Sequence, residues 1–370
     1  MIINISKLKK YTLFLITLGF LFFGNLVTIN AFHLKDKIEE KWIIIFLFSI
    51  ILLFFMLITK GNSNLKSIER RNKLKFMVLW ELFIVVTFIS RYLHGEFSIF
   101  EFILFSVLVP VSFFNNKIQQ YKNVILMASI ISIIPLIHIL GPMNSLGTII
   151  SIAGINLLNL LTIYKSRYRY VYIYISIIIF GTCIFITESR TALISFLIVS
   201  VMIIFTTLKE QNNSLMKYIK NSFKILLIIM LIYFSYDYIY SLIFDKYSIS
   251  SSDMLSGRKR IWIGTFRWGI TLFGNGIEYF IYNYNIADAH NTFIEILGAF
   301  GLLSFISFIL IYFYIIFKSL RYFKKLEYIC FFSLFLLLSL AENLFFINSR
   351  MIYSNILFLT YLGCLINEKQ

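Results

Sequence analysis

Residues 169–208 read RYVYIYISIIIFGTCIFITESRTALISFLIVSVMIIFTTL. They hold two apolar runs, 169–187 and 191–208, which are joined by the tripeptide at 188–190. Each run is close to the roughly 20 residues that an α-helix needs to cross a bilayer. Because the link is so short, Arg190 must lie near a membrane boundary, where a charge is costly unless it is paired or hydrated. The stretch therefore predicts two consecutive transmembrane helices with an arginine at their connection.

The rest of the chain repeats this pattern. Hydrophobic residues make up 59% of the 370 residues, charged residues make up 14%, and the mean hydropathy is +0.84. Soluble domains rarely exceed half apolar residues, so this composition excludes a large solvated domain. We expect an all-α polytopic membrane protein in which residues 1–370 form a single integral membrane domain. The predicted transmembrane helices, about 12 in number, are 11–30, 42–59, 76–93, 97–114, 124–140, 147–164, 169–187, 191–208, 223–244, 292–317, 327–345 and 351–366.

The formal net charge of +16 indicates a membrane topology and does not indicate nucleic-acid binding. If the N-terminus is cytoplasmic, 23 of the 34 lysines and arginines fall in segments on the cytoplasmic side. Cytoplasmic segments of membrane proteins carry such an excess. Five of the other 11 lie in the loop 245–290, and long loops follow this rule only weakly. The sequence therefore predicts that both termini are cytoplasmic.

Loop 245–290 is the longest polar segment, and the topology makes it extracytoplasmic. Long loops in compact proteins are usually functional. Within it, 248–253 is typical of a flexible stretch, whereas 257–273 combines aromatic and basic residues and predicts a short amphipathic helix. Such a helix would lie on the membrane lipid, with Trp262 at the headgroup level and its cations toward phosphate. The motif Gly274-Asn275-Gly276 would end it.

Three residues in short motifs share the extracytoplasmic side: Arg190, Arg258 and His290. Each has an ordinary structural explanation. Arg190 can be an interfacial anchor that pairs with Glu188, Arg258 can be one cation of a basic surface run, and a lone histidine at a helix start is more often structural than catalytic. These explanations weaken when the residues are taken together, because topology places all three on one face of the membrane.

The same residue types suit a lipid-linked diphosphate. Arginine presents a planar, permanently charged fork that binds phosphate through two hydrogen bonds. Histidine titrates near neutrality and can accept a proton from a hydroxyl nucleophile. The sequence contains no spacing typical of a metal site, and the three cysteines fall inside apolar runs where they act as packing residues: Cys183, Cys330 and Cys364. We therefore expect chemistry without a metal or another cofactor.

These motifs resemble the O-antigen ligase/O-antigen polymerase superfamily of bacterial membrane glycosyltransferases. The resemblance covers the topology of the whole chain, but in sequence mainly 186–305. The order of the motifs makes it specific, since each motif alone is weak. The matching motifs are Ser189-Arg190-Thr191-Ala192, Gly257-Arg258 with Trp262, Gly274-Asn275-Gly276, His290-Asn291-Thr292-Phe293-Ile294-Glu295, Gly298 and Gly301-Leu302-Leu303.

The resemblance implies a GT-C-like fold and the transfer of glycan from an undecaprenyl-diphosphate carrier. It further implies inversion at the anomeric carbon, with no metal and no nucleotide sugar. Carried over to this chain, Arg190 and Arg258 would hold the diphosphate and stabilise it as it leaves. His290 would orient or deprotonate the acceptor hydroxyl.

Further residues are predicted to contact the substrate. Arg260 lies two residues after Arg258 and could exchange roles with it, although the spacing to Trp262 favours Arg258. Asn291 is expected to cap the helix that follows it. Glu295 lies about one turn further on the same face. Glu342, near the end of another apolar run, is a weaker candidate, and lining a hydrated glycan cavity is the role that we favour for both acids.

The leading functional hypothesis is a polymerase that joins repeat units of an O-antigen, a capsule or a related surface polysaccharide. The alternative within the superfamily is a ligase that transfers finished glycan to lipid A-core or to protein. A hypothesis of another class is a transporter for the same lipid-linked oligosaccharide. The expected location is the bacterial inner membrane, and the expected partners are undecaprenyl-diphosphate-linked oligosaccharide, membrane lipid and a chain-length regulator protein.

Overall fold

The structure is a computed structural model. It describes residues 67–99, 101–103, 105–106, 133, 144–163, 168–209, 258–286, 288–321, 326–344, 358–359, 361–362 and 365–366. The elements with defined bounds are α3 (Ser67–Leu93), α6 (Asn144–Ile163), α7 (Arg169–Ile186), α8 (Arg190–Lys209), α11 (Arg258–Trp268), α12 (Tyr279–Tyr284), α13 (Thr292–Glu295), the π-helical turn η5 (Ile296–Phe300), α14 (Gly301–Arg321) and α15 (Leu326–Ser339). Every one of these described elements is helical, as the composition predicts.

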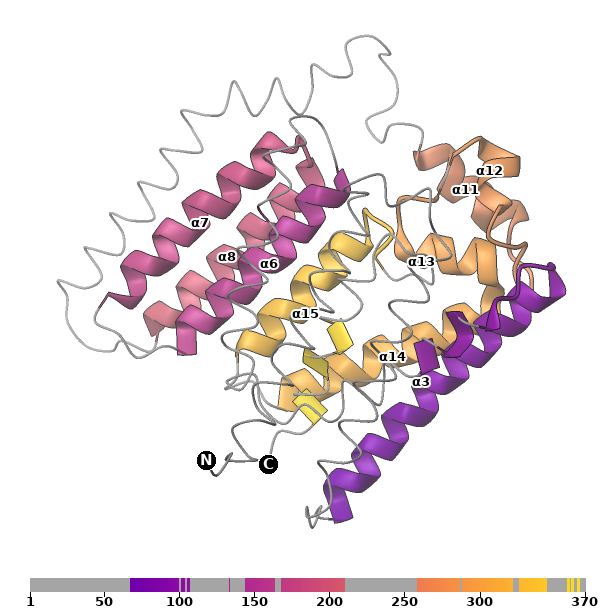
Figure 1. Ribbon diagram of the computed structural model, residues 1–370, viewed down its shortest axis with the longest axis horizontal. Helices are drawn as coiled ribbons and strands as arrows, with labels where there is room; N and C mark the ends of the chain where they lie inside the picture. The colour runs from indigo at the N-terminus through magenta and orange to yellow at the C-terminus, as the bar shows by residue number, and fades with distance from the viewer. Residues whose placement is uncertain are drawn as a thin grey trace, which may run out of the picture.

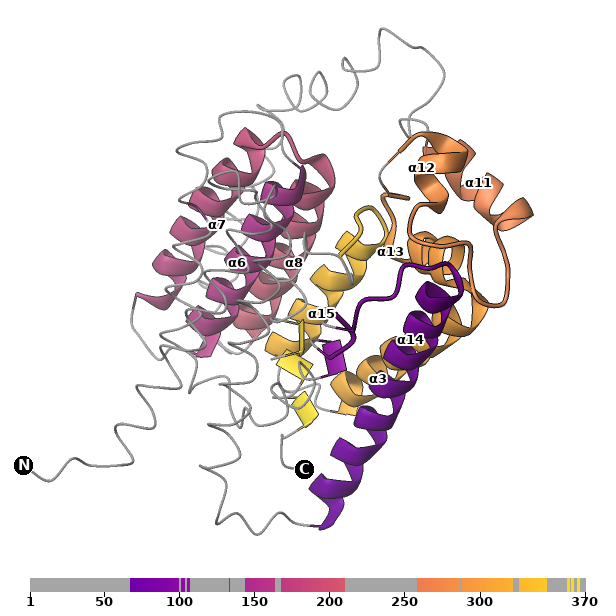
Figure 2. The ribbon, with the colours of Figure 1, turned by 45° about the vertical axis from the view of Figure 1, so that its right-hand side comes forward.

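The long helices form two packed groups, which Figure 1 and Figure 2 show from two directions. In the first group, α6, α7 and α8 lie side by side, and α15 packs against α6 and α8. In the second, α14 packs along α3. The short helices α11, α12 and α13 lie together at one end of the molecule, near the C-terminal end of α3 (Figure 1).

Among the described residues, four stretches are long and apolar enough to cross a membrane, and they lie in α3, α6, α7 and the run 292–319. The faces of α3 show why such a helix suits lipid. Leu74, Val78, Leu82, Val85 and Ile89 are exposed and recur every three or four residues, whereas aromatic residues on the opposite face are buried. Because this spacing places them on one side of the helix, α3 presents a continuous apolar stripe to its surroundings. Apolar helices of this kind identify a membrane protein.

Several predicted spans are confirmed as helices. Those at 147–164, 169–187 and 191–208 correspond to α6, α7 and α8, and the span at 76–93 is the second part of the longer helix α3. The spans at 11–30, 42–59 and 223–244 and the stretch 248–253 lie outside the described residues, as do most of 97–114 and 351–366 and all of 124–140 except residue 133. The predicted number of spans stays a prediction.

The predicted span at 292–317 is wrong as one continuous helix. The chain is helical from Thr292 through Phe300, but Gly301 has φ 86° and ψ −178°. Helical residues have negative φ near −63°, so the axis breaks at this residue and α14 starts in a new direction. The break follows a π-helical turn, and such turns occur frequently at functional sites. The predicted span at 327–345 is also too long, because α15 ends at Ser339.

The break at Gly301 is locked into the turn that follows α11. The backbone N–H groups of Asn275 and Gly276 donate to the Ala299 carbonyl at 3.2 and 3.0 Å, and the N–H of Leu302 donates to the Thr271 carbonyl at 2.9 Å. These bonds satisfy backbone groups that a helix end leaves free. The prediction that Gly274-Asn275-Gly276 ends an amphipathic helix over 257–273 is therefore wrong. The helix α11 ends earlier, at Trp268, and the glycine motif packs across the break at Gly301.

A carboxylate that follows α3 is hydrogen-bonded to the turn after α11. Both side-chain oxygens of Glu96, which follows α3, accept a hydrogen bond from the N–H of Ile277, at 3.0 and 2.8 Å. Three segments far apart in the sequence are thus fixed to one another at the end where α11 lies. This arrangement gives the short helices a rigid support.

The connection between α7 and α8 is equally constrained. Thr187 and Ser189 are buried, and Glu188 has φ 54°. A Cβ added at Gly147 in α6 would lie 2.4 Å from the Cβ of Ser189, so this turn lies directly against the α6 backbone. The first turn of α8, which begins with Arg190, is therefore held in a fixed position.

Gly301→Ala tests the close packing of the break at Gly301 against the Gly274-Asn275-Gly276 motif. A Cβ at this position would lie 2.1 Å from the backbone nitrogen of Gly274, in a conformation that is almost confined to glycine. We expect the free energy of unfolding to fall by at least about 1–3 kcal/mol, measured by thermal unfolding of the purified protein. Gly95→Ala is the matched control, because its φ of +72° imposes backbone strain but nothing lies within 4 Å of the added Cβ. Equal losses in the two variants would contradict the proposed close packing.

Candidate active site

The segment Asp288–Asn291 holds His290 in an unusual backbone conformation. His290 has φ 48°, which residues other than glycine rarely adopt. The Asp288 carboxylate accepts a hydrogen bond from the His290 N–H at 2.8 Å and so stabilises the turn. Strained backbone at one residue is a frequent property of functional sites.

Asn291 caps α13, as predicted. Its side-chain oxygen accepts hydrogen bonds from the N–H groups of Phe293 and Ile294 at 2.9 and 3.1 Å. Its side-chain nitrogen donates to the Leu340 carbonyl at 2.8 Å. One side chain thus starts the helix after His290 and also joins it to the segment after α15.

Thr292 strengthens the same junction. Its hydroxyl donates to the Glu342 carbonyl at 2.8 Å and accepts from the N–H of Leu344 at 2.9 Å. All of these groups are buried. The backbone on both sides of Glu342 is therefore fixed against α13.

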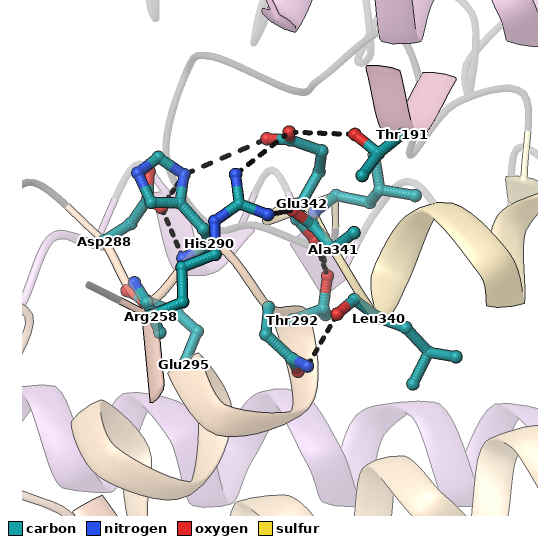
Figure 3. A network of polar contacts seen from close by, with 12 residues as sticks. Thr191, Arg258, Asp288, His290, Thr292, Glu295, Leu340, Ala341 and Glu342 are labelled. Carbon is teal, nitrogen blue, oxygen red and sulfur yellow. Dashed lines mark hydrogen bonds and ion pairs between the residues drawn. The ribbon is translucent and has the colours of Figure 1, made fainter. Parts of the chain in front are cut away.

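The side chain of Glu342 is the common partner of the site (Figure 3). Its Oε1 lies 3.8 Å from the Arg258 Nη2 and 3.4 Å from the Thr191 hydroxyl, and its Oε2 lies 4.0 Å from the His290 Nδ1. Arg258 also donates from Nη1 to the Ala341 carbonyl at 3.0 Å. The start of α8, the start of α11, the segment before α13 and the segment after α15 thus converge on one carboxylate.

Burial raises the pKa of Glu342 to about 7, although the neighbouring Arg258 opposes this rise. A carboxylate excluded from water loses its hydration, which disfavours the charged form. Glu342 lies beyond the end of α15, at the site rather than within an apolar helix. Its charge is therefore sensitive to whatever else contacts Arg258.

The imidazole of His290 is 40% exposed, and both of its carboxylate contacts use one nitrogen. Nδ1 lies 3.3 Å from an Asp288 oxygen and 4.0 Å from Glu342, whereas Nε2 is on the other edge of the ring (Figure 3). Burial lowers the pKa of His290 below its ordinary value, Asp288 opposes this change, and Arg258 adds to it. A lowered pKa favours the neutral ring at physiological pH, and the two acceptors at Nδ1 favour the tautomer with its proton there.

Arg190 is the first residue of α8 and is partly buried. Its neighbour Thr191 contacts Glu342, so the start of this helix belongs to the same assembly as Arg258 and His290. That the three motifs share the extracytoplasmic face of the membrane stays a prediction. That the Arg190 guanidinium binds substrate stays a prediction.

Three other predicted substrate contacts have different surroundings. Arg260 is exposed on α11. Trp262 donates from its ring nitrogen to the Ala289 carbonyl at 3.0 Å, and the buried Glu295 accepts from the Ala289 N–H at 2.7 Å. Trp262 and Glu295 thus hold Ala289 from both sides and position the adjacent His290. Contact of any of the three with substrate stays a prediction.

Sequence reasoning missed Asp288 and undervalued Glu342. Both carboxylates contact the Nδ1 of His290. The local spacing Asp-x-His could have indicated Asp288, because a side chain two residues earlier can bond the following backbone N–H. The distance of 52 residues between His290 and Glu342 gives no such local signal. In the part of the chain that the structure describes, no group of three His, Cys, Asp or Glu side chains could hold a metal ion.

Residues 175–309 match the family model described as O-Antigen ligase. The match confirms the resemblance to the O-antigen polymerase/ligase superfamily that the motifs indicated. Members of this family are glycosyltransferase-like enzymes of the ligase and polymerase type. No curated protein matches the chain. The matched region contains Arg190, Arg258 and His290 but ends before Glu342.

Thr292→Val tests the junction beneath Glu342. Valine keeps the shape of threonine but leaves the Glu342 carbonyl and the Leu344 N–H without this buried partner, at a cost of about 1–3 kcal/mol. We expect a lower melting temperature. Thr292→Ser, which retains the hydroxyl, should keep most of the stability. Equal melting temperatures for the valine variant and the unmodified protein would show that these hydrogen bonds do not hold the site together.

Proposed function

We propose that the protein is a polymerase of surface polysaccharide, acting on repeat units of an O-antigen or a capsule. It would transfer glycan from undecaprenyl diphosphate to a sugar hydroxyl of another lipid-linked repeat unit, at the extracytoplasmic face of the inner membrane. The convergence of Arg258 and His290 on Glu342, within a chain of the O-antigen ligase and polymerase superfamily, carries this proposal.

The donor side of the site would be built by arginines. In the structure Arg258 reaches one carboxylate oxygen and one backbone carbonyl, so its guanidinium is already oriented by two acceptors. A diphosphate would replace the weaker of these contacts, the 3.8 Å approach to Glu342. Arg190 would contribute a second guanidinium from the start of α8, where the helix dipole also favours an anion. Fixed positive charge of this kind stabilises a leaving diphosphate.

The acceptor side would be built by His290. Its Nε2 is the ring nitrogen that makes no hydrogen bond within the described chain, and the ring is exposed enough to reach a substrate. The neutral imidazole would take the proton of the acceptor hydroxyl as the oxygen attacks the anomeric carbon. Attack opposite the departing diphosphate inverts that carbon, and the reaction needs no metal.

Polymerisation and ligation share the donor and differ in the acceptor. We favour polymerisation because one class of lipid-linked repeat unit then supplies both substrates. The deciding experiment supplies purified protein in liposomes with lipid-diphosphate repeat units alone. Growth of the glycan with release of lipid diphosphate supports a polymerase. Transfer that occurs only when lipid A-core is added would support a ligase, and translocation of the donor without a new glycosidic bond would support a transporter.

Arg258→Lys tests recognition by a forked guanidinium. Lysine keeps the charge but offers a single ammonium in place of two parallel N–H donors, so we expect transfer to fall by about 10²–10³-fold, as when a fixed donor to the developing charge is lost. Arg267→Ala, which removes an exposed cation from the same helix, serves as the control and should retain activity. Full transfer by the lysine variant would refute two-point recognition of the diphosphate.

His290→Asn tests the base. Asparagine tolerates the positive φ of this position better than alanine does, so the turn should persist while the titratable ring is lost. We expect transfer to fall by about 10²–10⁴-fold, with binding of radiolabelled donor lipid unchanged. Equal loss of donor binding and of transfer would instead assign His290 a structural role.

A further inference from the structure

Glu342 lies between Arg258, which is proposed to bind the donor, and His290, which is proposed to activate the acceptor. One oxygen approaches Arg258 at 3.8 Å, and the other approaches His290 at 4.0 Å. Both distances are longer than a charge-assisted hydrogen bond, which is typically about 2.7–2.9 Å. The carboxylate is thus within reach of both partners and firmly bonded to neither.

The backbone at Glu342, in contrast, is fixed by hydrogen bonds. The carbonyl of Glu342 accepts from Thr292 at 2.8 Å, and the carbonyl of Ala341 accepts from Arg258 at 3.0 Å. Any rearrangement is therefore confined to the side chain. A small rotation of the carboxylate would shorten one of its two long contacts and lengthen the other.

Among the described residues, four charged or polar groups face this carboxylate. They are Thr191 from α8, Arg258 from α11, and Asp288 and His290 from the segment before α13. Arg258 is the only cation among these four, and Asp288 already contacts the histidine at 3.3 Å. An anion that engages Arg258 would therefore remove the positive partner of Glu342 and leave His290 as its remaining cationic partner once protonated.

We propose that Glu342 is a positioning residue whose carboxylate moves from Arg258 to His290 when the donor diphosphate binds Arg258. This inference rests on the proposed function. Donor binding and acceptor activation are thereby coupled through one carboxylate. Without donor, Glu342 neutralises Arg258. With donor, Glu342 joins Asp288 at Nδ1 and stabilises the imidazolium that forms during transfer.

The acceptor hydroxyl loses its proton to Nε2 of His290 as its oxygen forms the new bond to the anomeric carbon. The bond between that carbon and the diphosphate oxygen breaks, and its electron pair leaves with the lipid diphosphate. The positive charge gained by the ring is compensated by Asp288 and by Glu342.

Glu342→Gln tests this coupling, because glutamine keeps the shape and loses the charge. With no carboxylate competing for Arg258, the donor KM should fall. With less stabilisation of the imidazolium, kcat should fall at least about 10-fold, a part of the roughly 10²–10⁴-fold that a general base contributes. A purely structural role would not separate kcat from KM in this way.

The pH profile supplies the second readout. Glu342 and His290 must both be unprotonated for transfer, so activity is lost as pH falls through the higher of their pKa values. For the unmodified protein that fall should occur near pH 7, the pKa of Glu342. In Glu342→Gln only His290 titrates, and the fall should move below 6.5, because burial lowers the pKa of His290 from that value.

Glu342→Asp is the second variant, which restores the charge on a shorter side chain and should return the pH profile toward that of the unmodified protein. An increased donor KM with unchanged kcat would overturn the proposal and make Glu342 a simple tether for Arg258. An unchanged pH profile in Glu342→Gln would also overturn it. If the unmodified protein forms no glycosidic bond, the proposed function itself fails. If it forms the bond, and the Glu342 variants have the same kcat, donor KM and pH profile as the unmodified protein, only the coupling fails.

Discussion

The buried carboxylate of Glu342 sets the main physical constraint on the site. A charge removed from water is tolerated only when partners replace its hydration, and here the partners come from three separate parts of the chain. The hydroxyl of Thr191, the guanidinium of Arg258 and the ring of His290 all face it. The start of α8, the start of α11 and the segment before α13 must therefore be held in one arrangement for this carboxylate to be compensated. The polar residues of the site depend on one another for the same reason.

The remainder of the fold supplies the rigidity that this arrangement requires. Backbone hydrogen bonds join the turn after α11 to the break at Gly301, and Glu96 joins the same turn to α3. The turn before α8 is fixed against Gly147 in α6. Each arginine of the proposed donor site thus begins a helix whose position is set by contacts outside the site. A site built on fixed helix ends can orient a flexible lipid-linked substrate without large movements of its own.

Much of this architecture could be predicted from the sequence, because hydropathy records burial in lipid directly. The bounds of α7 and α8 and the cap at Asn291 were predicted from local patterns, and these predictions are confirmed. The break at Gly301 was not predicted, because the apolar run continues through it and only the crossing backbone requires the glycine. Glu342 was undervalued for a related reason. Its partners lie far away in sequence, so no spacing reveals that a carboxylate near the end of an apolar run is the common contact of an arginine and a histidine.

In the proposed reaction Arg258, together with the start of α8, forms the binding site for the diphosphate of the donor lipid, within reach of His290. A cryo-electron microscopy structure of the protein in nanodiscs with undecaprenyl diphosphate tests it most directly. We expect diphosphate density against the Arg258 guanidinium, with the Glu342 carboxylate displaced toward His290. Diphosphate bound elsewhere, with Arg258 still facing Glu342, would contradict it.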